Sequence, residues 1–190
     1  PQADVRDGSP IVWNLRKVKS PFELAIMRET ARIGVEAHKA LIASTRVGVS
    51  ERALAAVFSF VTKKAGARDL AYNTILMSGK NHAYGHYAEH DRVLNEGDFV
   101  ILDAAPDYLN YHVDISTTFP ASGRFSPRQR ELYEVALAVH GVALANYRPG
   151  TTLREVGLKV DAFLKARGLE RYAQDFRGII RLGGYNHSIG

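Results

Sequence analysis

The 190-residue sequence contains no cysteine, and this absence removes two kinds of chemistry. A chain without thiols has neither a disulfide framework nor a cysteine nucleophile. No apolar run approaches the roughly 20 residues of a membrane-spanning helix, and the first residues lack the pattern of a signal peptide. The net charge of +5 comes from scattered Lys and Arg residues, and the closest group (Arg124, Arg128 and Arg130) is shorter than the basic stripe of a nucleic-acid binder. We therefore expect neither nucleic acid nor a membrane as a partner.

What the sequence does contain is a pair of acidic residues in apolar surroundings. Residues 97–105 predict a buried strand, residues 106–110 a turn, and residues 111–119 a second strand. If the turn is centred on Tyr108 and Leu109, Asp103 lies opposite Asp114, with Cβ atoms about 4.5–5.5 Å apart. Two bare carboxylates in this position repel each other, and a shared proton or a bound cation removes the conflict. Two metal ions with a bridging hydroxide suit this separation.

A plainer interpretation of this pair is also open. The chain has 20 acidic residues, so two of them eleven positions apart occur often by chance. A β-bulge would move one of the two off the shared face and leave it in solvent. The spacing alone therefore does not choose between a metal site and a solvated pair, and the choice depends on the rest of the chain.

Two stretches of the chain repeat the same helix signals about 100 residues apart. Residues 20–23 (Ser-Pro-Phe-Glu) and 126–129 (Ser-Pro-Arg-Gln) each combine an N-cap, a proline in the first turn and a Glu or Gln at the third position. In both copies a Gly turn leads to a second capped helix, at about 50–64 and 152–166, which a Gly closes. The repeat predicts two similar halves, and the counterpart of the 97–119 hairpin would lie past Gly190.

The seven histidines divide into isolated and clustered ones. His38 and His140 lie on predicted helical faces and are most simply core or surface residues. His82, His86 and His90 follow at four-residue spacing, but Gly and Asn residues between and before them argue against a helical metal site. His187 lies in the glycine-rich segment 183–190, which allows the backbone to approach a ligand closely.

Together these motifs resemble a known family. The order Ser-Gly-x-Asn-x-x-x-x-His-Tyr, Asp-Ala-Ala, Asp-Ile-Ser-Thr-Thr-Phe-Pro and His-Ser-Ile-Gly is similar to that of the pita-bread metallopeptidases, above all the Xaa-Pro aminopeptidases and prolidases. The resemblance runs from about Arg16 to Gly190. It implies an α+β pita-bread fold of two pseudo-symmetric halves, each a helix pair plus an antiparallel sheet, with the second half incomplete. It also implies that residues 1–15 are a linker from a preceding N-terminal domain, and that residues 16–190 form a catalytic domain incomplete at its C-terminus.

The resemblance further implies a site with two divalent metal ions. Asp103, Asp114 and His187 would be metal ligands, and His86 would donate a hydrogen bond to the scissile carbonyl or the tetrahedral intermediate. Ser116, where the family usually has Thr, would support Asp114. Two Glu ligands would lie past Gly190, so we expect these 190 residues alone to be inactive. Mn²⁺ best suits such an oxygen-rich ligand set, with Co²⁺ or Zn²⁺ as substitutes.

The activity that the resemblance implies is hydrolysis of the Xaa-Pro bond by a hydroxide that bridges the two metal ions. The substrate would be a peptide with Pro at its second position; we expect a homodimer, and the cytoplasm is the favoured compartment. Gly183 stands where proline-specific members often have a pocket histidine, and Tyr111-His112 is similar to the methionine aminopeptidase branch. The alternatives are a methionine aminopeptidase-like enzyme, a metal-free relative of creatine amidinohydrolase, and a non-catalytic pita-bread module that binds peptides or proteins.

Overall fold

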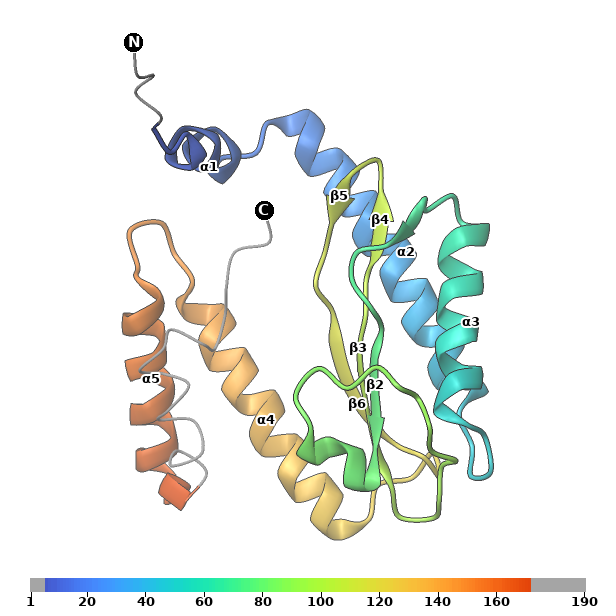
Figure 1. Cartoon of the computed structure of the whole chain (residues 1–190). Coiled ribbons are helices and arrows are strands. Elements are labelled where there is room, and N and C mark those ends of the chain that lie inside the picture. Colours follow the sequence, from blue (N-terminus) through green and yellow to red (C-terminus); the bar gives the residue numbers. More distant parts are fainter. Residues whose placement is uncertain (1–5, 172–190) are drawn as a thin grey trace. The chain divides into compact units, whose positions relative to one another are not determined.

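The computed structural model describes residues 6–171, which form two compact units with a boundary between Phe125 and Ser126 (Figure 1). The first unit combines helices with antiparallel strands, and the described part of the second is a helix pair. Across this part of the chain, no helix combines the length and the apolar character that a membrane crossing requires.

Three helices begin the first unit: α1 (Ser9–Lys17), α2 (Pro21–Ser44) and α3 (Glu51–Lys64). The predicted capping box starts α2, because the Ser20 hydroxyl accepts from Glu23 N at 3.3 Å and the Glu23 carboxylate accepts from Ser20 N at 2.6 Å. Ser50 caps α3 through Ala53 N at 3.1 Å. The helix starts at 20 and 50 are therefore confirmed. Helix α1 covers the end of the 1–15 stretch, whose role as a linker stays a prediction.

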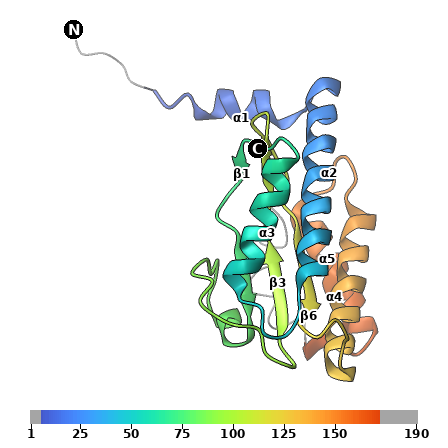
Figure 2. The same ribbon diagram turned by 90° about the vertical axis from the view of Figure 1, so that its right-hand side faces the viewer.

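Two small antiparallel sheets complete this unit. Strands β2 (Ile75–Ser78), β3 (Phe99–Asp103) and β6 (Ser116–Pro120) form one in the order β2-β3-β6, and β1 (Asp69–Leu70), β4 (Pro106–Tyr108) and β5 (Tyr111–His112) form the other in the order β1-β4-β5. Helices α2 and α3 lie side by side over one face of β3 and β6 (Figure 2). The core between these layers includes Leu54, Phe58, Leu76 and Leu102, all fully buried. Each such side chain stabilises the fold by about 1.5–3 kcal/mol.

The register of the predicted hairpin is wrong by two residues. Asp103 pairs with Ser116 and not with Asp114, and the turn is centred on Leu109 and Asn110, with φ of 53° and 64°. Two left-handed residues are typical of a type I′ turn, whose usual sequence signal is a glycine. The second strand also divides into β5 and β6 around residues 113–115. The first strand is buried only at alternate positions, so Asp103 lies on its half-exposed face.

The second unit repeats the helix pair of the first. It consists of α4 (Pro127–Asn146), which Ser126 and Gln129 cap, and α5 (Leu153–Ala166), which Thr152 and Glu155 cap. Val139, Val160 and Leu164 are buried between them. The predicted helix signals at 126 and 152 are therefore confirmed, and the repeated halves agree in their helix pairs.

Candidate active site

The two aspartates converge on one phenol. The Tyr72 hydroxyl, in the segment between β1 and β2, lies 2.5 Å from Asp103 Oδ1 and 3.1 Å from Asp114 Oδ1. A phenol carries a single proton and fully satisfies only one carboxylate at a time. Asp103 and Asp114 therefore share this donor, and their negative charges lie close together. The pair is a real cluster, although the predicted cross-strand opposition does not produce it.

The backbone explains how Asp114 reaches this position. Asp103 ends β3, and Asp114 lies in the irregular residues between β5 and β6. Ala104 N donates to Ile115 O at 3.1 Å, which joins the residue after Asp103 to the residue after Asp114. Asp103 is half-buried and Asp114 is exposed, so the pair opens to solvent on one side.

Tyr72 stays protonated in this environment. Burial raises the pKa of Tyr72 well above its ordinary value of 10.0, and the hydrogen bond with Asp103 and the charges of both aspartates raise it further. At neutral pH the phenol is therefore a permanent donor that orients Asp103. The sequence analysis missed Tyr72, because nothing in the spacing of a tyrosine 31 residues before Asp103 indicates the contact.

The oxygen donors at this cluster suit a divalent metal ion. Two carboxylates form the kind of oxygen-rich group that Mn²⁺ and Mg²⁺ prefer. Within residues 6–171 no third Asp, Glu or His joins them to complete a metal site. His187, the predicted histidine ligand, lies outside the described residues. The carboxylates of Asp103 and Asp114 thus fit the role of ligands that the resemblance implies for them.

His86 and Ser116 lie in different surroundings. His86 is exposed on the loop after the short 3-10 helix η1 (Gly79–Ala83), with φ of 54°. This left-handed conformation is uncommon for a residue with a side chain, so its neighbours must hold it. In the described residues no hydrogen bond joins His86 to Asp103. Ser116 faces Asp103 across the β3–β6 pair. The catalytic role of His86 and the supporting role of Ser116 stay predictions.

Two further histidines of the first unit, His82 and His90, contact backbone carbonyls. His82 Nε2 lies 3.1 Å from Met77 O, and His90 Nε2 lies 2.9 Å from Thr74 O. A carbonyl only accepts, so each Nε2 carries a proton. Residues 84–92 form no helix, so His82, His86 and His90 do not lie on one helical face.

His38 is a core residue, as the sequence suggested. Its Nε2 donates to Ala104 O at 3.0 Å and its Nδ1 accepts from the Thr117 hydroxyl at 3.0 Å, while its ring edge meets Phe58. Burial lowers the pKa of His38, and the bond to Ala104 and the charge of Asp103 oppose this shift. A neutral histidine therefore joins α2 to the residue that follows Asp103.

Curated relatives of the chain are peptidases. It is 34% identical to a Xaa-Pro aminopeptidase of Escherichia coli over 99% of this chain and 45% of that protein, and 32% identical to one of Haemophilus influenzae over 88% and 39%. A Xaa-Pro dipeptidase of Rattus norvegicus is 32% identical over 74% of this chain and 30% of its own length. The chain thus spans less than half the length of these relatives.

Solved structures and a family model agree with these relatives. A proline aminopeptidase P II from Yersinia pestis superimposes with a TM-score of 0.78 at 38% identity, over 80% of this chain and 35% of its own. Zinc-substituted E. coli aminopeptidase P in complex with product gives 0.81 at 33% identity, over 96% and 39%. Both support the pita-bread architecture that the helix pairs and antiparallel sheets indicate. The model of metallopeptidase family M24 matches residues 25–190, and the chain belongs to that family.

Proposed function

We propose that the protein is a metal-dependent exopeptidase that hydrolyses the Xaa-Pro peptide bond. The observation that carries the proposal is the convergence of Asp103 and Asp114 on the single proton of Tyr72. Two carboxylates that meet at a partly exposed position offer oxygen donors to a divalent cation, and membership of a metallopeptidase family supports the same conclusion.

Each residue has a defined part in this proposal. Asp103 and Asp114 hold the metal ions, and Tyr72 orients Asp103 through its hydrogen bond. When bound, two divalent ions lower the pKa of water and polarise a carbonyl. From the family resemblance, neutral His86 donates a hydrogen bond to the oxygen of the scissile carbonyl, where negative charge develops. His187 is the proposed histidine ligand.

The finer parts of the proposal are the metal, the substrate and the assembly. Mn²⁺ is the proposed metal, because oxygen donors suit it, and Zn²⁺ is a substitute that a structural neighbour is known to carry. The proposed substrate has a free amino terminus and Pro at the second position, since relatives with 32–34% identity are named for Xaa-Pro bonds. On the family resemblance we propose a homodimer.

A peptide series tests the proposal directly. We would incubate a purified form of the protein that includes the two Glu ligands implied by the family resemblance with Mn²⁺. We would then measure release of the first residue from a Xaa-Pro-Yaa peptide, a matched Xaa-Ala-Yaa peptide and a Xaa-Pro dipeptide. Preferential cleavage of the proline peptides that a chelator abolishes and Mn²⁺ restores would support it. Equal cleavage of the alanine peptide would reject the proline specificity, and absence of cleavage and of Mn²⁺ binding would reject the enzyme.

A further inference from the structure

A second acidic site lies in the first unit, away from the Asp103–Tyr72–Asp114 cluster. Glu51, the first residue of α3, has an exposed fraction of 0%. Its carboxylate accepts from Ser78 N and Ser78 Oγ, both at 2.7 Å, from Asn81 Nδ2 at 3.1 Å and from Arg92 N at 3.2 Å. All these donors are neutral, and all lie in residues 78–92. We call Glu51 with these three partners the Glu51 anchor.

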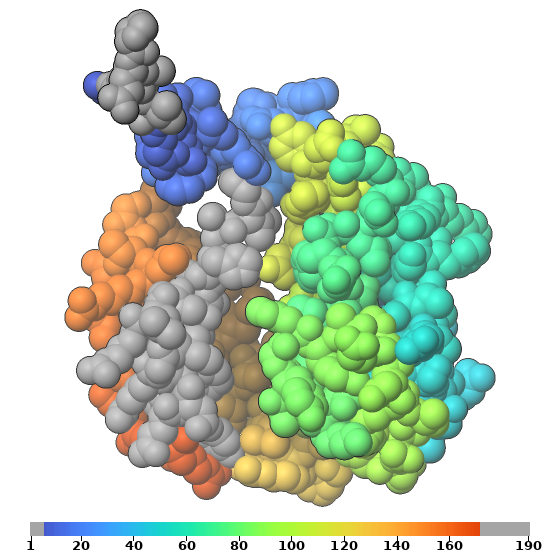
Figure 3. All heavy atoms as spheres, viewed as in Figure 1, coloured from blue at the N-terminus to red at the C-terminus, as the bar shows by residue number. Residues whose placement is uncertain are grey.

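The anchor holds both ends of one loop. Ser78 ends β2 and Arg92 precedes the bridge between Ser50 and Val93, so residues 79–92, here named the His86 loop, begin and end at Glu51. The backbone takes part as well, because Glu51 N donates to Arg92 O at 2.9 Å. The loop is part of the molecular surface, where it is drawn in green (Figure 3).

Gly79 leaves space for the side chain of Arg92, which adds further hydrogen bonds to the Glu51 anchor. The Arg92 side chain donates to Ser78 Oγ at 3.2 Å and to Asp98 Oδ2 at 2.6 Å, and it passes directly over Gly79. A Cβ atom at Gly79 would lie 2.6 Å from Arg92 Nη2, and Gly79 has φ of 50°. The Ser-Gly-x-Asn motif thus has a physical explanation: Ser78 and Asn81 donate to Glu51, and Gly79 leaves space for the Arg92 side chain.

The anchor continues to the residue beside His86. Asn81 Nδ2 also donates to Asp91 Oδ1 at 3.1 Å, and Tyr87 donates its hydroxyl to the Asp91 carboxylate. This bond raises the pKa of Tyr87 to about 12 and lowers the pKa of Asp91. Glu51, Asn81, Asp91 and Tyr87 therefore form a continuous chain of hydrogen bonds that ends one residue from His86.

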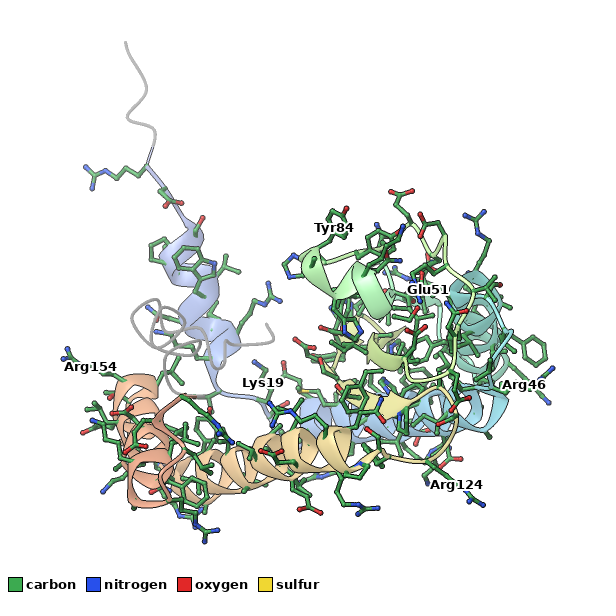
Figure 4. The ribbon with its side chains drawn as sticks, turned by 90° about the horizontal axis from the view of Figure 1, so that it is seen from below. Lys19, Arg46, Glu51, Tyr84, Arg124 and Arg154 are labelled. Carbon is green, nitrogen blue, oxygen red and sulfur yellow. The ribbon has the colours of Figure 1, made fainter. Side chains whose placement is uncertain are left out.

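The conformation of the loop depends on such support. Between η1 and the bridge at Val93 the loop has no helix or strand, and His86 and His90 both adopt the left-handed region, with φ of 54° and 52°. Non-glycine residues keep this conformation only where the surroundings determine it. In Figure 4 Glu51 lies among the side chains between α3 and the loop, whereas Tyr84 lies at the outer edge of η1.

We propose that Glu51 is a positioning residue that fixes the His86 loop and thereby orients His86 toward the reacting carbonyl. This inference rests on the proposed function, which gives His86 its role. If Glu51 only stabilised the fold, its substitution would lower turnover by the same factor whether or not His86 is present. A positioning residue acts on turnover through His86 and loses that effect when His86 is absent.

A double-mutant cycle separates these two roles. Glu51→Gln keeps the shape of the side chain but directs an NH₂ group at donors, so the loop shifts. With His86 present, we expect kcat for the Xaa-Pro peptide to fall about 10- to 100-fold with little change in KM, since displacements of about 1 Å reduce rates by up to this amount. In the His86→Ala background, Glu51→Gln should change kcat less than about 3-fold. Equal losses in both backgrounds, or no loss in either, would overturn the proposal.

A matched control and a milder variant keep the test decisive. Glu29→Gln removes an exposed glutamate that pairs with Arg32 on α2, and it should leave kcat unchanged. If Glu51→Gln does not fold, Tyr87→Phe replaces it in the cycle, because it removes only the hydroxyl that meets Asp91. A kcat loss that disappears in the His86→Ala background supports the proposal, and one that persists overturns it.

A measurement that needs no turnover distinguishes the two proposals. Histidine ring NMR of the full chain reports the surroundings of His86 in the unmodified protein and in Glu51→Gln. If the unmodified protein cleaves no Xaa-Pro peptide, the proposed function fails, and the ring signal alone decides whether Glu51 positions His86. A shifted His86 signal with an unchanged His38 signal supports positioning, and an unchanged His86 signal overturns it.

Discussion

The first unit contains two acidic sites whose carboxylates have opposite surroundings. Glu51 is fully buried, and neutral donors from three residues satisfy its carboxylate. Asp103 and Asp114 lie at the open side of a sheet and share one phenol proton. A saturated carboxylate holds structure, because every lone pair already has a partner. A partly exposed pair of carboxylates offers oxygen donors to a cation, which is the role that we propose for Asp103 and Asp114.

The largest expected effect on Mn²⁺ binding, and the strongest test of the comparison between the two acidic sites, is at Asp103. Asp103→Asn should weaken Mn²⁺ binding by more than about 100-fold, because loss of a ligand exceeds the effect of its supporting contacts. Isothermal titration calorimetry measures the affinity. The control is Asp69→Asn, an exposed carboxylate of the same unit that pairs with Lys63 at 3.3 Å and should bind Mn²⁺ normally. Normal binding by Asp103→Asn would remove Asp103 from the metal site.

The next effect is expected at the shared phenol. Tyr72→Phe removes the donor that orients Asp103 and should weaken Mn²⁺ binding by about 10- to 100-fold. The same titration applies. Tyr111→Phe is a matched control, since its hydroxyl donates to the Glu23 carboxylate at 3.0 Å, away from the aspartates. If both variants bind Mn²⁺ as tightly as the unmodified protein, Tyr72 does not support metal binding.

For the free energy of unfolding, we expect a larger loss at Glu51 than at the aspartate pair. Glu51→Gln should lower the free energy of unfolding by about 1–3 kcal/mol, because it leaves buried donors without an acceptor. Asp114→Asn, in metal-free protein, should leave it unchanged or raise it, because it removes repulsion from an exposed pair. Urea unfolding with EDTA measures both. A larger loss in Asp114→Asn than in Glu51→Gln would reverse the assignment of structural and functional roles.

The smallest effect concerns pH and His38, which lies behind Asp103. Burial lowers the pKa of His38 below its ordinary value of 6.5, so the folded state binds this proton less readily than the unfolded state. The fold should therefore lose stability as the pH falls below about 6.5. Urea midpoints at about pH 7.5 and pH 5.5 should differ less in His38→Gln than in the unmodified protein. An identical pH dependence in both would contradict the shift.

The sequence predicted the helices well because their signals are local. The N-caps at Ser20, Ser50, Ser126 and Thr152 act within four residues, and all four start helices. The hairpin register failed for the opposite reason, since Leu109 and Asn110 form a left-handed turn without glycine. Asp103 and Asp114 still meet at the Tyr72 hydroxyl, although Asp114 lies in the irregular residues between β5 and β6 and not in a paired strand. Their role as metal ligands stays a prediction.

Contacts across long stretches of chain explain what the sequence did not reveal. Tyr72 meets Asp103 from 31 residues away, and Glu51 meets Ser78 from 27. Neither residue type, nor its spacing, indicates such a partner before the fold is known. Motif resemblance identified Ser78, Gly79 and Asn81 as a pattern, but only the structure shows that their common partner is Glu51.

In the His86 loop, the residues that fix the loop differ from the residues that it exposes to solvent. Its anchor lies at the inner side, while Tyr84 is 60% exposed and contacts Tyr87 with ring centroids 5.7 Å apart. Exposed positions on a rigid support accept substitution with little loss of stability. For protein engineering, the exposed positions of the loop can be substituted while the contacts of the Glu51 anchor are kept. A library at Tyr84 samples new surfaces beside His86 while Glu51, Ser78 and Asn81 keep their contacts.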